Sequence, residues 1–150
     1  MKSIIALTDL TDSCKPVIAL SEELAKGMGW RLYVMHVVPP HDAKGGPAYV
    51  GNEVDDGQPR RDAAAALKEL RHKLHAQRDE LIARGVDCHA VMVEGQLEEK
   101  LLKEVDAINP EFVIIGRHCH DMLYKVIFGN RSDKLLDKLK QPLMVVPLPK

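Results

Sequence analysis

Residues 2–28 read KSIIALTDLTDSCKPVIALSEELAKGM, and this stretch carries the unit from which the fold is built. Its first part, residues 2–7, is a short and mostly apolar run, which predicts a buried strand. The polar residues 8–13 interrupt that run and supply helix-capping side chains, and Pro16 suits the first turn of a helix. Apolar side chains then recur at helical spacing at Val17, Leu20, Leu24 and Met28. The stretch therefore predicts one strand followed by one helix.

The same alternation continues through the chain. Further strands are predicted at residues 31–38, 86–93, 112–115 and 143–147, and further helices at residues 59–84, 96–108 and 132–140. Strands that alternate with helices indicate a parallel sheet with right-handed crossovers, and the apolar strands indicate burial on both faces. We therefore predict an α/β fold: a single domain over residues 1–150 with a five-stranded parallel open sheet and helices on both faces. The glycine-rich residues 41–58 are expected to form a loop that is mobile without ligand.

Composition excludes several classes of function. The net charge is -1 and no basic face is evident, which argues against a nucleic-acid partner. No apolar stretch is long enough to insert into a membrane, and the N-terminal apolar run breaks at Thr8, too early for a signal peptide. We therefore expect a cytoplasmic protein whose three cysteines are free thiols.

Ligands of open α/β sheets bind beyond the carboxyl ends of strands, where the strand order reverses. Two segments meet that description: Leu7, Thr8 and Asp9 after the first strand, and residues 115–132 after the fourth. In the second segment the candidate binding residues are Ile115, Gly116, Arg117, Gly129, Asn130, Arg131 and Ser132, and its glycines, polar side chains and helix start suit a phosphate. Four basic and two acidic side chains in or beside it give a local charge of +2. The alternative is a plain helix cap with structural glycines, and Asp9 in turn could simply cap a turn.

Other chemistry-bearing residues fit no known constellation. The run His118, Cys119 and His120 lacks the spacing of a structural zinc site, so no metal site is expected. His36 lies within a predicted strand and is interpreted as a core histidine with a hydrogen-bond partner. No acidic pair suited to Mg²⁺-assisted hydrolysis is present, so we predict no catalytic residues.

The chain resembles the universal stress protein family. The resemblance rests on residues 6–9 (ALTD), residues 36–38 (HVV), the closing residues 142–147 (PLMVVP) and a glycine motif after the fourth strand. Nucleotide-binding members carry G-x2-G-x9-G-(S/T) there. This chain has Gly116 and Gly129 at the right spacing, but Cys119 replaces the second glycine and Asn130 takes the Ser/Thr place.

That resemblance implies a Rossmann-like fold of the adenine nucleotide alpha hydrolase type and a stress-response regulatory function. By it, Asp9 and the Val37 backbone would contact adenine or ribose, and Gly116, Gly129, Asn130 and Ser132 would surround ribose and phosphates. The implied ligand is ATP or a related adenine nucleotide, with Mg²⁺ only alongside ATP and weak ATP hydrolysis as the lesser alternative. The implied partners are a second copy, bound through the C-terminal strand, and a regulatory protein. The alternative within the family is a dimeric interaction module whose degenerate motif binds no nucleotide.

Overall fold

The computed structural model describes residues 1–38, 58–117 and 135–147. Its elements follow in the order β1 (Ser3–Leu7), η1 (Asp12–Cys14), α1 (Lys15–Met28), β2 (Arg31–Val38), α2 (Gln58–Ala83), β3 (Cys88–Glu94), α3 (Leu97–Ile108), β4 (Phe112–Gly116), α5 (Leu135–Lys138) and β5 (Leu143–Val146). The predicted α/β alternation is confirmed. The expectations for the segments 39–57 and 118–134 lie outside the described residues.

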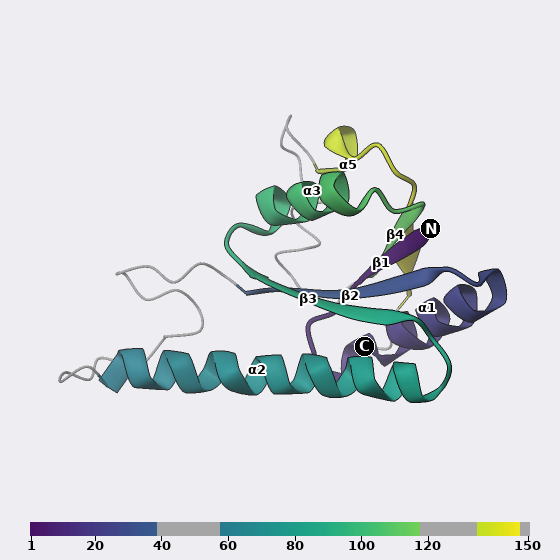
Figure 1. The fold of residues 1–150 in the computed structure, drawn as a ribbon. Coiled ribbons are helices and arrows are strands. Elements are labelled where there is room, and N and C mark those ends of the chain that lie inside the picture. The colour runs from purple at the N-terminus through teal and green to yellow at the C-terminus, as the bar shows by residue number, and fades with distance from the viewer. Residues whose placement is uncertain (39–57, 118–134, 148–150) are drawn as a thin grey trace.

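All five strands form one parallel sheet in the order β3-β2-β1-β4-β5. The chain first builds outward from β1 to β3 and then returns to add β4 and β5 on the other side (Figure 1). The strand order therefore reverses between β1 and β4, whose register pairs Ile4 with Phe112 and Ala6 with Ile114. Both strands are buried along almost their whole length, as the apolar sequences require.

Helices cover both faces of the sheet, as predicted. On one face, α1 and α2 pack against the sheet through buried side chains that include Val17, Leu74 and Leu81. On the other face, α3 packs through Leu101 and Val105 against strand residues such as Ile5. Figure 1 shows the long α2 together with α1 on one side and α3 with α5 on the other. Because each face has its own apolar cluster, the strands need no polar side at their centres.

Two element ends follow from backbone chemistry. Gly29 ends α1 in the left-handed conformation, at φ 69°, and its N–H bonds back to Ala25 and Lys26 carbonyls. The third strand begins at Cys88, later than the predicted Val86. The reason is that the Val86 N–H donates to the Leu81 carbonyl at 3.0 Å. This bond belongs to the C-terminal cap of α2, so the Val86 N–H is not available to pair with β2.

The cysteines correct one expectation. Cys88 is a free, buried thiol, and burial is the main cause that raises its pKa to about 12. Cys14, which is fully buried at the start of α1, is disulfide-bonded. The expectation of free thiols is therefore wrong for Cys14.

Candidate functional site

The candidate site is the corner where β1 ends and the chain turns toward α1. Leu7 is the last residue of β1, and Thr8 continues the pairing because its N–H donates to the Met35 carbonyl of β2 at 2.9 Å. On the other side of β1, the strand β4 ends at the buried Gly116. The corner therefore lies at the carboxyl edge of the sheet, next to the reversal of strand order.

The backbone of the corner is folded tightly on itself. Leu10 has φ 65°, a left-handed conformation that is uncommon for a residue with a branched side chain. The Leu10 N–H donates to Thr8 Oγ1 at 2.9 Å, and the Asp9 N–H points to Cys14 Sγ at 3.5 Å. These local contacts hold the turn, and the 3-10 helix η1 then leads into α1.

The Asp9 carboxylate takes part in that turn. Its Oδ1 accepts from the Thr11 N–H at 2.9 Å and from the Thr11 hydroxyl at 2.6 Å. The alternative that Asp9 caps a turn is therefore correct. Within the described residues no hydrogen bond is made by Oδ2, and Asp9 is only half-buried. One carboxylate oxygen thus fixes the turn while the other remains available to a ligand. The sequence pattern did not reveal this contact of Thr11, although the Asp-x-Thr spacing is a signature of such turns.

Val37 extends the site along β2. The Arg31 N–H donates to β1 and the Leu32 N–H donates to Asp87 before β3, so backbone groups of odd-numbered β2 residues face β1. The Met35 carbonyl fits this alternation because it accepts from Thr8. Val37 is the next odd-numbered residue, so its backbone N–H and C=O point past the end of β1 and over the corner.

The remaining predicted site residues fall in two groups. Ile115 and Gly116 are buried at the end of β4, whereas Arg117 is exposed and its N–H donates to the Val146 carbonyl of β5 at 2.8 Å. The structure thus brings Leu7, Thr8, Asp9, Val37, Ile115, Gly116 and Arg117 to one edge of the sheet. The others lie outside the described residues, namely Cys119, Gly129, Asn130, Arg131 and Ser132, together with His118 and His120.

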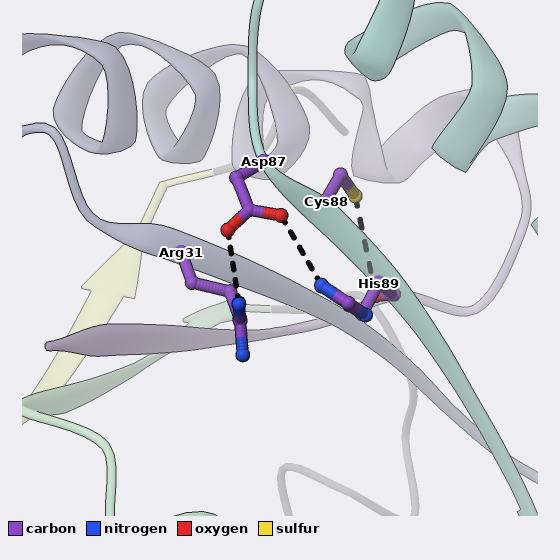
Figure 2. Close-up of polar contacts among 4 residues, drawn as sticks. All are labelled: Arg31, Asp87, Cys88 and His89. Carbon is purple, nitrogen blue, oxygen red and sulfur yellow. Dashed lines mark hydrogen bonds and ion pairs between the residues drawn. The ribbon is translucent and has the colours of Figure 1, made fainter. Parts of the chain in front are cut away.

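A second polar cluster lies where β2 and β3 begin, at the opposite end of the strands from the corner (Figure 2). Asp87 accepts from Arg31 Nε at 2.9 Å and contacts His89 Nε2 at 3.1 Å. Its pKa is lowered, chiefly by the hydrogen bond from Arg31. The Arg31 pKa is raised, first by its contact with Tyr33 and then by Asp87. The charges of Arg31 and Asp87 are opposite, so we interpret the cluster as a structural contact between β2 and the start of β3.

Neither a metal-binding cluster nor a membrane-length apolar helix occurs among the described residues. Across residues 1–38, 58–117 and 135–147, no group of three or more His, Cys, Asp or Glu side chains is placed to hold a metal ion. In the same part of the chain, no helix combines the length and apolar character that crossing a bilayer requires.

The fold and the position of the corner define a class: an open, Rossmann-like α/β sheet covered by helices on both faces. A profile described as the universal stress protein family matches residues 1–147. The chain therefore belongs to the universal stress protein family. No curated protein matched the sequence.

Solved structures share this fold over nearly the whole chain. A universal stress protein family member from Burkholderia pseudomallei has 21% identity and a TM-score of 0.70, with 97% of this chain and 96% of that chain covered. An Archaeoglobus fulgidus universal stress protein, solved in complex with dAMP, has 14% identity and a TM-score of 0.60, with 99% and 98% covered. A family protein from Arabidopsis thaliana, solved with AMP bound, has 16% identity and a TM-score of 0.60, with 98% and 92% covered.

Proposed function

We propose that this protein is a regulatory member of the family that binds ATP or a related adenine nucleotide at the corner formed by Thr8 and Asp9. The observation that carries the proposal is the position of the Asp9 carboxylate at the carboxyl edge of the sheet, beside the reversal of strand order. Relatives of the same fold have been solved with dAMP and with AMP.

The groups at the corner suit the nucleoside end of such a ligand. A carboxylate oxygen accepts hydrogen bonds from ribose hydroxyls, and the Val37 backbone offers one donor and one acceptor to the adenine edge. Beyond Gly116, the phosphates would meet the glycine motif, whose residues Gly129, Asn130 and Ser132 supply backbone and side-chain donors. We propose binding without catalysis in the cytoplasm, with Mg²⁺ entering only as the counter-ion of ATP. A regulatory protein partner would respond to the bound state.

Calorimetric titration with AMP and with ATP tests this proposal. We compare wild type with Asp9→Asn, because asparagine keeps the oxygen that accepts from Thr11 but loses the negative charge. The control is Asp12→Asn, a change of the same chemistry in the same loop at a carboxylate whose side chain is 93% exposed. Asp9→Asn is expected to weaken binding about tenfold to a hundredfold, while the control leaves it unchanged.

The outcomes separate the alternatives. If wild type takes up neither nucleotide, the chain is the non-binding interaction module, as the Cys119 and Asn130 replacements in the glycine motif would suggest. If wild type binds and Asp9→Asn binds equally well, the nucleotide lies elsewhere and the residue assignment is wrong.

We also propose a homodimer through β5. Among the described strands it pairs with β4 alone and forms one edge of the sheet, and its Met144 is 37% exposed. An apolar edge strand presents unpaired backbone groups that a second copy could cover. Sedimentation at micromolar concentration is expected to give a dimer for wild type and a monomer for Met144→Lys. The matched control is Ile82→Lys, an exposed apolar residue on α2, and a wild-type monomer would remove the proposal.

A further inference from the structure

The corner that carries Asp9 is also held from the neighbouring strand by a histidine. His36 lies near the end of β2, is 8% exposed, and places its Nδ1 atom 2.9 Å from the Thr8 carbonyl oxygen. A carbonyl can only accept, so Nδ1 carries the proton and donates to Thr8. With the bond from the Thr8 N–H to Met35, both backbone groups of Thr8 are fixed to β2.

This anchoring matters because the next residues are held in an unfavourable backbone conformation. The left-handed Leu10 persists only where surrounding contacts determine it. Contacts inside the turn come from Thr8 Oγ1 and Asp9 Oδ1. Among the hydrogen bonds of the described residues, the one from His36 alone joins this turn to a side chain of another strand.

We propose that His36 is a positioning residue for nucleotide binding: its Nδ1–H holds the Thr8 carbonyl and thereby aims the Asp9 carboxylate at the ligand. The expected effect on binding rests on the proposed function, whereas the bond from His36 to Thr8 requires no ligand. His36 itself does not contact the nucleotide. It acts through Thr8, one residue before the carboxylate, so a small rotation of that peptide displaces Asp9.

Three substitutions separate this role from simple filling of the core. Asparagine carries its amide nitrogen on Cγ, as histidine carries Nδ1, so His36→Asn can restore the bond to Thr8. Glutamine carries its amide one bond further out, at the position of Nε2, so His36→Gln cannot restore it in the same place. His36→Leu fills the space without any donor and leaves the Thr8 carbonyl unpaired.

The first measurement needs no ligand. A long-range proton–nitrogen NMR spectrum of wild type is expected to show a protonated Nδ1 at His36. The amide resonances of Asp9, Leu10 and Thr11 are expected to shift in His36→Leu and His36→Gln and to return toward wild type in His36→Asn. An unprotonated Nδ1, or equal shifts in all three variants, overturns the proposal.

The second measurement is the affinity for AMP, set beside the free energy of unfolding from urea titration. We expect His36→Leu and His36→Gln to bind AMP about tenfold more weakly, and His36→Asn to recover most of that loss. If affinity falls in step with stability across all three, His36 has only a packing role and the proposal fails. If wild type binds no AMP, the proposed function is wrong independently of His36. The NMR result alone then decides whether His36 fixes the backbone conformation of residues 8–11.

Discussion

The number of reactive thiols in the unfolded chain tests the disulfide directly. The sequence holds three cysteines, Cys88 is free, and Cys14 is disulfide-bonded. Because Cys14 is 0% exposed, a cysteine of a second molecule could reach it only by entering the core. We therefore expect an intrachain bond, which would take up two of the three cysteines. Two cysteines are then consumed, and the chain unfolded in guanidinium without reductant should show one thiol; after reduction it should show three.

The rate of modification in the folded protein carries the second part of the prediction. With a pKa of about 12 instead of 9.0, the Cys88 thiolate at pH 8 falls from about a tenth of the thiol to about one part in ten thousand. Reaction with a disulfide reagent should therefore be slower in the native protein than in the unfolded chain by about three orders of magnitude. Removal of the disulfide by Cys14→Ser should lower the free energy of unfolding by about 2–4 kcal/mol without reductant. In the presence of reductant, the difference in the free energy of unfolding should fall to the cost of replacing the buried Cys14 thiol with a serine hydroxyl.

Two results would refute this reasoning. Three reactive thiols in the unreduced unfolded chain would mean that Cys14 forms no disulfide. Two thiols per chain, with a linked dimer on a non-reducing gel, would mean that the bond joins two molecules. In the cytoplasm, the location proposed above, disulfides are usually transient, so the count should be taken both with and without air oxidation.

Further changes test the fold. Arg31 lowers the pKa of Asp87 below its ordinary 3.8, so the bond between them stabilises the protein above that pH and is lost as the pH falls through the lowered value. Asp87→Asn should therefore lose less stability between pH 7 and pH 3 in urea titrations than wild type does. Leu101→Ala should lower the free energy of unfolding by about 2–5 kcal/mol, because this fully buried side chain joins α3 to the sheet. At Gly29 nothing lies within 4 Å of an added Cβ but φ is +69°, so Gly29→Ala should cost about 1–2 kcal/mol through backbone strain alone. Gly27 lies inside α1 with the same open space, so Gly27→Ala should instead stabilise the protein by about 0.5–1 kcal/mol. Thermal unfolding of the two variants would show the opposite signs.

Local patterns were sufficient to predict most elements. The bounds of β2 were predicted without error at Arg31–Val38, because the apolar β-rich run ends at two prolines. The 3-10 helix η1 was not predicted, because a turn of three residues has no periodicity to recognise. In α2, Leu67, Leu74 and Leu81 recur at a spacing of seven and so share one side of the helix. Leu74 and Leu81 are fully buried but Leu67 is only half-buried, since periodicity gives the direction of a side chain and not what covers it.

For the candidate site too, some features follow from the sequence and others only from the tertiary structure. The sequence by itself determined the α/β class, the parallel sheet and the position of Asp9 directly after the first strand, because each rests on residues that are neighbours along the chain. Only the tertiary structure decided the strand order and the contacts it creates: His36 against Thr8 across 28 residues, and Arg31 against Asp87 across 56. The physical reason is that periodicity records whether a residue is buried, whereas the identity of its partner depends on which strands share hydrogen bonds, and no local pattern encodes that choice.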